Sequence, residues 1–404
     1  MSTSLLYHAF GIRGYQYRST DYYEGQVVFH IEAPRQKLKC PGCNSSDVTR
    51  HGAVERQFKS VPIGGKPVLI RFAVPRVECP HCKVRRQVEL GFADPRRSYT
   101  RSFERYALDL CRQMTIQDVA QHLNVGWDTI KDIQKRSLQQ RYKKPKLKRV
   151  RQIAIDEICI GGGHRYLTIV LDLERGAVVF VGQGKGADAL LPFWKRLRAS
   201  GAKVQAVASD MSAAYIKAVS ENLSSAVHVL DRFHVVKLFN EKLSNLRRDL
   251  HRQAVDDLHK QVLKGTRWLL LKNPENLDEK RDERTRLDEA LALNRPLATA
   301  YYMKEELRQY WEQPDKATAQ RFLASWIERA QISGIRMLQQ FAKTLQGHLF
   351  GLLAWYDYPI STGPLEGVNN KIKTLQRQAY GYRDYEFFQL KIYALHECKY
   401  ALLG

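Results

Sequence analysis

The chain has 404 residues, of which 65 are Lys or Arg and 42 are Asp or Glu, so its formal net charge is +23 before any histidine is protonated. Its hydrophobic share of 44% and charged share of 26% are close to globular averages, which excludes a disordered, collagen-like or disulfide-scaffold chain. At roughly 100–200 residues per domain the length allows about two to four domains, and the excess of positive charge favours nucleic acid as a partner.

No stretch of the sequence reaches the ~18 consecutive apolar residues of a membrane span. The first eight residues lack the charged start and the continuous apolar core of a signal peptide. We therefore expect a soluble, cytoplasmic protein with no membrane partner. The seven cysteines are an odd number spread over a long chain, which favours reduced thiols over a disulfide framework.

Residues 1–100 are expected to form a small β domain built on a metal. It contains two C-x-x-C pairs, Cys40-Pro-Gly-Cys43 and Cys79-Pro-His-Cys82, with strand-like sequence between them. Four thiolates suit one tetrahedral, structural zinc ion, and the spacing suits a zinc ribbon whose hairpin lies between the two knuckles. Redox-active thiols are the alternative, although they normally need only one such pair. His51 and His81 are possible substitute ligands, but four cysteines already complete the site.

Residues 101–140 show helical periodicity. Thr115 is placed to cap a short second helix, a turn follows at 124–126, and a third helix is expected over 127–138. This order predicts a helix-turn-helix domain, with an ordinary helical hairpin as the alternative. Polar and basic residues on the third helix are the candidate DNA contacts: Thr129, Lys131, Lys135 and Arg136.

The segment 141–151 is a basic linker, with seven cations in eleven residues and no acid. Pro145 opposes a helix there, and dense like charge resists compaction. The segment is either a solvated linker or one that also follows DNA phosphates, because each cation placed on a phosphate releases a counterion. Both interpretations can hold together. The candidate phosphate contacts are Lys143, Lys144, Lys146, Lys148 and Arg149.

From residue 152 the sequence alternates between strands and helices. The expected order is β-β-β-α-β-α-β and ends at residue 230, which predicts a mixed sheet covered by helices. The Gly-rich loop 182–188 matches neither a dinucleotide fingerprint nor a P-loop, so we interpret it as a turn in which Asp188 caps a helix. Residues 231–360 are expected to be helical throughout.

Two acids follow apolar strands, Asp156 after 153–155 and Asp210 after 204–209, and Glu366 lies just inside a late capped helix. Acids at neighbouring parallel strand ends open onto one crevice, where like charges repel unless a cation joins them. Carboxylate oxygens suit Mg²⁺, which keeps waters and can accept a substrate phosphate. Each acid alone could instead be a solvated strand end or a helix-dipole partner. Glu157 is a rival to Asp156, but successive strand residues point to opposite faces.

The order of these motifs resembles the DDE transposases of bacterial insertion sequences, and in particular the ISL-three family. The resemblance covers nearly the whole chain, and the segments that carry it are 155–157, 209–215, 231–237, 363–370 and 380–383. It implies a catalytic triad of Asp156, Asp210 and Glu366 holding two Mg²⁺ or Mn²⁺ ions. It also makes Asp231 and His234 possible active-site auxiliaries, with a capping Asp and a packed His as the alternative.

The implied fold class is multidomain α+β, in which an RNase H-like mixed α/β domain is split by an all-helical insertion. The expected domains are a zinc ribbon at 1–100, a helix-turn-helix at 101–140, a basic linker at 141–151, the catalytic domain at 152–230 and 361–404, and the insertion at 231–360.

The implied function is binding of terminal inverted repeats, followed by metal-dependent strand cleavage and strand transfer. The partners would be double-stranded DNA of the transposon ends and the target, with a homodimer in the DNA complex, at the bacterial nucleoid. Two other functions stay open at this point. One is a DNA-binding regulator with an inactive RNase H-like domain, and the other is a structure-selective nuclease of the same fold.

Overall fold

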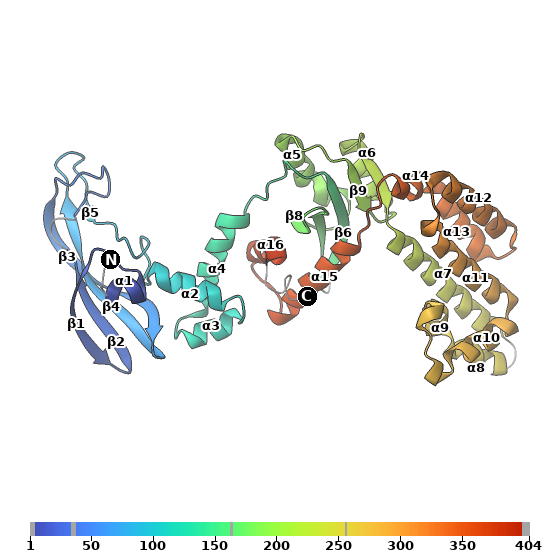
Figure 1. The fold of residues 1–404 in the computed structure, drawn as a ribbon, viewed down its shortest axis with the longest axis horizontal. Coiled ribbons are helices and arrows are strands. Elements are labelled where there is room, and N and C mark those ends of the chain that lie inside the picture. Colours follow the sequence, from blue (N-terminus) through green and yellow to red (C-terminus); the bar gives the residue numbers. More distant parts are fainter. Residues whose placement is uncertain (1–4, 34–37, 162–164, 255–256, 398–404) are drawn as a thin grey trace. The chain divides into compact units, whose positions relative to one another are not determined.

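The computed structural model describes residues 5–33, 38–161, 165–254 and 257–397 (Figure 1). The described chain divides into two compact units, one within residues 1–143 and one over residues 144–397. No helix in these described ranges is both long and apolar enough to cross a membrane.

The first unit begins with a β-sheet and a short helix. Its elements are α1 (Leu5–Phe10), β1 (Gln16–Tyr23), β2 (Gln26–Glu32), β3 (Thr49–Ile63), β4 (Lys66–Glu78) and β5 (Arg85–Gln87). The strand order is β1-β2-β4-β3, with β5 paired to β4. β2 and β4 are parallel, and β3 and β4 form an antiparallel hairpin. Gly64 and Gly65 join that hairpin with φ values of +56° and +79°, which a tight two-residue turn requires.

A three-helix domain follows in the same unit: α2 (Arg101–Leu110), α3 (Ile116–His122) and α4 (Trp127–Tyr142). Thr115 caps α3 as expected, because its side chain accepts from the Asp118 amide while the Asp118 carboxylate accepts from the Thr115 amide. Ala107, Val119 and Ile130 form the centre of the small core. α4 continues to Tyr142, beyond the expected end at residue 138.

The second unit contains a five-stranded mixed sheet: β6 (Gln152–Gly161), β7 (Arg165–Asp172), β8 (Ala177–Gln183), β9 (Ala206–Ser209) and β10 (Val227–Leu230). The strand order is β10-β9-β6-β7-β8. The meander β6-β7-β8 is antiparallel, whereas β9 and β10 join β6 in parallel. The expected mixed α/β sheet is therefore confirmed, and β6 is its central strand.

Helices α5 (Leu191–Ser200) and α6 (Ala213–Asn222) pack on this sheet. Phe193 and Tyr215 share one buried cluster with Ile153 and Ile155 of β6. The expectation for Asp188 is wrong: it lies inside a 3₁₀ turn, Ala187–Leu190, and Leu190 is the N-cap residue of α5. Pro192 near the start of α5 explains the later start, since proline favours the first helical turn.

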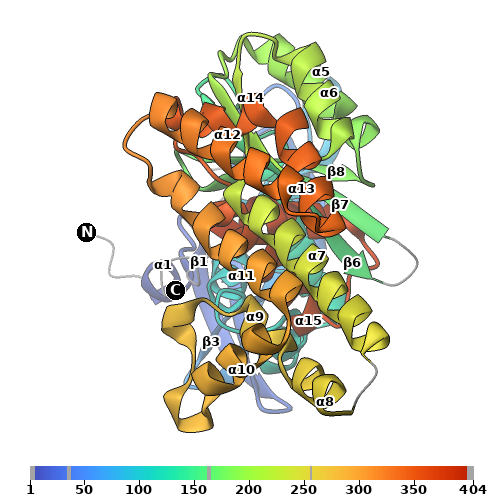
Figure 2. The same ribbon diagram turned by 90° about the vertical axis from the view of Figure 1, so that its right-hand side faces the viewer.

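The insertion between β10 and the last helices is helical throughout its described residues, as expected. Its α-helices are α7 (Arg232–Gln253), α8 (Asp257–Gly265), α9 (Arg267–Leu271), α10 (Glu283–Leu293), α11 (Arg295–Arg308), α12 (Lys316–Ile332), α13 (Arg336–Gly347) and α14 (Leu349–Leu353). Figure 2 shows α7, α11, α12 and α13 side by side. Phe239, Trp326 and Phe341 stack edge to face in their common core.

The chain returns to the sheet through α14, which packs on β10. A Cβ atom at Gly351 would lie 2.4 Å from Cγ of Leu230, so only glycine allows this close approach. The last two α-helices are α15 (Gly363–Gln378), which packs beside β6 (Figure 1), and α16 (Tyr385–Tyr393), which packs beside β8. α15 therefore carries Glu366 back to the central strand.

Candidate active site

Asp156 and Glu157 point to opposite sides of β6, and their partners differ accordingly. Glu157 Oε1 accepts from the Tyr215 hydroxyl at 2.7 Å and from the Gly186 amide at 3.0 Å. Asp156 Oδ2 accepts from Nδ2 of Asn369, on α15, at 2.9 Å. Glu157 thus already has partners on the α6 side, whereas Asp156 faces the helix that carries Glu366.

Asp210 follows β9, the parallel neighbour of β6, and its carboxylate Oδ1 accepts from the Ser212 amide at 2.9 Å. Ser209 is fully buried, and its hydroxyl donates to the Asp210 carbonyl at 2.9 Å. His228 Nε2 lies 2.8 Å from the same hydroxyl. Because the single hydroxyl proton is used toward Asp210, His228 donates from Nε2. This chain of hydrogen bonds fixes the loop that presents Asp210.

Glu366 lies in the first turn of α15 and is exposed. Asn369 lies three residues later on the same face of the helix and is only 6% exposed. The Asn369 Oδ1 atom is buried and has no hydrogen-bond partner among the residues that the structure describes. The contact between Asn369 and Asp156 therefore fixes the side of α15 that faces β6.

Asp231 joins two segments that are 131 residues apart in the chain. It occupies the N-cap position of α7, but its side chain makes no cap hydrogen bond there. Instead, Oδ1 accepts from the backbone amide of Thr362 at 3.0 Å, just before α15. Oδ2 lies 3.1 Å from Nδ1 of His234. Asp231 is thus a link between α7, His234 and the start of the Glu366 helix, and not a cap of its own helix.

The electrostatics of the site reflect crowded carboxylates. Burial raises the pKa of Asp156, and the negative charges of Asp210 and Glu157 act in the same direction. Burial lowers the pKa of His234, but its hydrogen bond to Asp231 and the charges of Asp156 and Asp210 outweigh this, so the pKa is raised overall. Burial raises the pKa of Asp231, yet its hydrogen bonds to His234 and Thr362 leave it lowered. The raised pKa favours the protonated, positively charged form of His234 among these acids.

The donor set of Asp156, Asp210 and Glu366 fits a hard divalent cation, because carboxylate oxygens are the ligands that Mg²⁺ and Mn²⁺ prefer. A buried acid beside another acid gains most from such a charge. The three carboxylates do not form a closed cluster: among the described residues, the four cysteines are the one group of metal-ligating side chains gathered within 4.8 Å.

The four predicted cysteine ligands come together at the ends of the β3–β4 hairpin. Sγ of Cys40 lies 3.4 Å from Sγ of Cys82, and Sγ of Cys43 lies 3.5 Å from Sγ of Cys79. The Gly42 amide donates to Sγ of Cys40 at 3.3 Å, as amides of a metal knuckle do. Four thiolates at these distances fit tetrahedral zinc. His81 lies 3.2 Å from Asp47 and outside this group.

The predicted DNA contacts have different surroundings. Arg136 donates to the Tyr99 hydroxyl at 2.8 Å and to the Glu104 carboxylate at 2.9 Å, inside the three-helix domain. Lys131 Nζ lies 5.3 Å from the ring centroid of Trp127, and Trp127 is 43% exposed. In the basic segment, Leu147 and Val150 are buried in the core of the second unit. The five cations at 143, 144, 146, 148 and 149 are all exposed.

Comparison with known proteins identifies the family. A family model described as a transposase matches residues 153–392. The helix-turn-helix domain of transposase family ISL3 matches residues 88–138, and the zinc finger of the transposases of IS204, IS1001, IS1096 and IS1165 matches residues 36–82. The chain belongs to the ISL3 family of transposases. The expected order of zinc ribbon, helix-turn-helix and transposase domain is thereby confirmed.

Individual transposases of insertion sequences match along most of this ISL3 family member. The transposase of IS1001 from Bordetella parapertussis is 33% identical over 371 residues, which is 91% of each chain. The transposase of IS1557 from Mycobacterium tuberculosis H37Rv is 27% identical over 400 residues, or 92% of this chain and 89% of the relative. A Drosophila P element transposase in a strand transfer complex aligns with a TM-score of 0.32 and 13% identity over 60% of this chain and 76% of that chain.

Three structural contacts of the site had no assigned role in the sequence interpretation. Asn369 and Tyr215 lie inside the motifs that carry the family resemblance, but nothing in the sequence pairs them with Asp156 and Glu157. Spacing offered one signal, since Asn369 follows Glu366 by three residues and must share its helix face. The Thr362 amide is a backbone donor, and a sequence pattern gives no indication of its distant acceptor.

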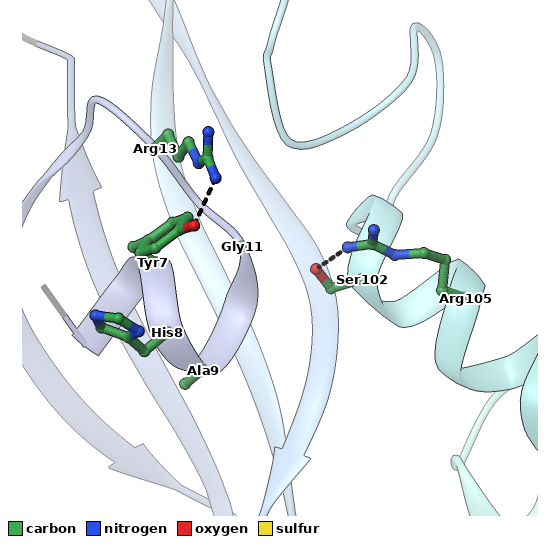
Figure 3. Close-up of a pocket in the computed structure, with 7 residues that line it drawn as sticks. All are labelled: Tyr7, His8, Ala9, Gly11, Arg13, Ser102 and Arg105. Atoms are coloured by element: carbon green, nitrogen blue, oxygen red, sulfur yellow. Dashed lines mark hydrogen bonds between the residues drawn. The ribbon is translucent and has the colours of Figure 1, made fainter. Parts of the chain in front are cut away.

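A separate hollow of about 630 Å³ lies in the first unit between α1 and α2 (Figure 3). Arg13 stacks on Tyr7 with its guanidinium carbon 4.4 Å from the ring centroid. Arg105 donates to Ser102 Oγ at 3.3 Å, and Ser102 donates to the Phe10 carbonyl at 2.6 Å. Because these side chains bind one another and hold α1 against α2, we assign this hollow a structural role.

Proposed function

We propose that this transposase cleaves and transfers DNA strands with Asp156, Asp210 and Glu366, after binding the terminal inverted repeats of its element. The observation that carries the proposal is the hydrogen bond between Asn369 and Asp156. It turns the acid-bearing side of α15 toward β6, whose parallel neighbour β9 leads into Asp210. These contacts support an assignment in which the three acids, from three separate segments, act together beside the central strand.

In this proposal the chain's own residues hold and orient the ligands. Asn369 holds one oxygen of Asp156, and the Ser212 amide holds one oxygen of Asp210. The Glu157 amide also donates to Oδ1 of Asp156, at 2.7 Å. The lone pairs that these hydrogen bonds leave on Asp156 and Asp210, together with Glu366, would bind two Mg²⁺ or Mn²⁺ ions. Such ions, when bound, activate a water or a 3′-hydroxyl and stabilise the leaving oxygen of an in-line displacement. No covalent protein intermediate is needed.

Asp231 and His234 act as positioning residues in the proposal. Asp231 holds the Thr362 amide and the His234 ring together, which sets the start of α15 relative to α7. His234 would supply a positive group beside the carboxylates, where a DNA phosphate must approach. This interpretation is preferred to simple capping, because the Asp231 side chain makes no cap hydrogen bond to α7.

DNA recognition is assigned to the first unit and the basic segment. Thr129, Lys131 and Lys135 on α4 would contact base edges and nearby phosphates, and the five exposed cations of the basic segment would contact phosphates only. Arg136 is left out of this set, because it pairs with Glu104 and Tyr99. We also propose a homodimer in the DNA complex, one copy for each end of the element.

The experiment that tests the catalytic assignment compares purified variants on DNA carrying the element's end. Asp156→Asn, Asp210→Asn and Glu366→Gln should each abolish strand cleavage while binding to end DNA stays near normal, since affinity comes mainly from cations. Glu157→Gln is the matched control. It should retain most activity, because a glutamine oxygen can still accept from Tyr215 and Gly186.

Near-normal cleavage by any one triad variant would remove that residue from the set. A product in which the element end is joined to target DNA distinguishes the three competing functions. A transposase converts a cut element end and an intact target into a strand-transfer product, whereas a structure-selective nuclease yields cleavage alone. A DNA-binding regulator yields neither product.

A further inference from the structure

The helical insertion carries a second concentration of positive charge, remote in sequence from the first unit. A hollow of about 590 Å³ opens where the end of α7 meets α8 and α9. Six of its ten lining residues are Lys or Arg, and none of the described lining residues is Asp or Glu. The six cations, which define the insertion groove, are Arg247, Arg248, Arg252, Lys260, Lys264 and Arg267.

Arg247 shows how crowded these charges are. It is half-buried and donates from Nη1 to the Leu263 carbonyl at 2.7 Å, which ties α7 to α8. Its Nε is buried without a hydrogen-bond partner among the described residues. Burial lowers the pKa of Arg247, and the positive charges of Arg267 and Arg248 lower it further. The groove therefore brings like charges together, and an anionic ligand would offset the free energy of their repulsion.

Several cations elsewhere on the insertion are paired with close carboxylates. Arg329 binds Glu306 through both terminal nitrogens, and Arg308 lies 2.8 Å from Glu305. In the insertion groove, Arg252 pairs with Asp249 at 3.7 Å, between side chains that are 75% and 61% exposed. Solvent screens such a pair strongly. The exposed pair therefore offsets little of the charge of Arg252.

Arg267, one of the groove cations, stacks on an exposed tryptophan ring. The Arg267 guanidinium carbon lies 4.8 Å from the ring centroid of Trp268, which is itself 65% exposed. Stacking on an exposed indole holds a guanidinium at the surface without using its hydrogen-bond donors. A guanidinium held this way can bind two oxygens of one phosphate.

We propose that the insertion groove binds the phosphodiester backbone of duplex DNA, as a contact separate from the helix-turn-helix domain. The inference rests on the proposed function in taking DNA as the polyanion that this protein handles. Several cations around one open hollow match a ligand that repeats a single negative charge along a backbone. An acidic protein segment is the competing ligand, and the test distinguishes it.

The test uses the full chain and a duplex of arbitrary sequence, without divalent metal. The groove variant carries Arg252→Gln, Lys264→Gln and Arg267→Gln, and it leaves the structural Arg247 in place. The matched control removes the same charge from exposed positions on the insertion outside the groove, with Arg295→Gln, Arg336→Gln and Lys343→Gln. Affinity is measured by fluorescence anisotropy over a range of salt concentrations, and thermal unfolding checks the fold of each variant.

The groove variant should bind DNA about ten-fold more weakly at low salt. Its plot of log affinity against log salt should be shallower by about 0.9 for each lost phosphate contact, thus by about 2 to 3 in all. The control should show a smaller change in both measures. If the triple variant unfolds, the single variant Arg252→Gln replaces it, with an expected slope change of about 0.9.

Equal affinity and equal slope for the groove variant and the wild-type protein would overturn the proposal. So would an unchanged DNA slope together with weaker binding of polyglutamate, which would identify an acidic protein as the ligand. Failure here is distinct from failure of the catalytic assignment. The groove test needs no chemistry, and Asp156→Asn protein should show the same slope change when the groove substitutions are added to it.

Discussion

Asn369 donates a hydrogen bond to Asp156 across 213 residues of sequence, with 2.9 Å between Nδ2 and Oδ2. The contact joins the central strand of the sheet to the helix that returns after the whole insertion. Its effect is on geometry. The Glu157 amide donates to the other oxygen, Oδ1, at 2.7 Å, so neighbours orient both oxygens of Asp156.

Replacing Asn369 should therefore weaken catalysis more than folding. Asn369→Ala leaves one Asp156 oxygen without its donor, and partners that orient metal-ligating groups typically contribute about 10- to 100-fold in metal affinity or activity. We expect cleavage to fall by that factor and the Mg²⁺ concentration for half-maximal cleavage to rise. Asn370→Ala, at an exposed neighbouring position, is the control. An unchanged Mg²⁺ requirement in Asn369→Ala would show that the residue contributes only to packing.

The link through Asp231 predicts a loss of stability together with a change at His234. Asp231→Ala leaves the buried Thr362 amide without its acceptor, which should cost about 1–3 kcal/mol of unfolding free energy. Asp231→Asn keeps an acceptor oxygen for Thr362 and should cost less. Because Asp231 raises the pKa of His234, both variants should lower that pKa, measured by NMR titration of the imidazole. A His234 pKa that does not move would contradict the contact.

The sequence alone predicted the element order of the catalytic sheet and the helical nature of the insertion. Local patterns carry that information, since apolar runs such as 153–155 indicate buried strands and helical periodicity marks long helices. The start of α5 was missed because Pro192 and a 3₁₀ turn determine it, and Asp188 resembles a cap only by residue type. Residue type indicates whether a side chain can cap a helix, and the backbone conformation determines whether it does.

The contacts that assemble the site could not be predicted in the same way. Asp231 was expected either to cap α7 or to act beside the active site, and its actual acceptor role depends on a backbone amide 131 residues away. Glu157 and Asp156 were separable by strand alternation, because alternation is local. Their partners Tyr215 and Asn369 are set by the packing of α6 and α15, which only the tertiary structure contains.

The cysteine cluster predicts one zinc ion per chain that stabilises the first unit. Metal analysis of purified protein should find about one zinc, because two knuckles complete a single closed site. Cys40→Ser or Cys79→Ser should release it and lower the unfolding temperature of the β3–β4 domain. Cys111→Ser and Cys159→Ser, outside the cluster, should keep it. Folded wild-type protein without zinc would refute the site.

His228 leads us to expect that acid lowers the folding stability of the second unit. The effect would act through the loop that carries Asp210. Burial lowers the pKa of His228 to about 4, and its ring is held between Ser209 and Phe350, whose ring centroid lies 6.4 Å away. In the unfolded chain the imidazole has its usual pKa of about 6.5. Between these two values the unfolded state binds more protons than the folded state, so protonation favours unfolding.

Stability from this group should thus be complete above about pH 6.5 and should fall as the pH drops toward 4, by up to about 1.4 kcal/mol per pH unit. His228→Gln removes the titrating group while an amide can still donate to Ser209. Urea unfolding at several pH values should show a flatter acid dependence for the variant than for the wild-type protein. Parallel pH profiles would mean that His228 becomes charged without disturbing the fold, and that the Asp210 loop does not depend on a neutral imidazole.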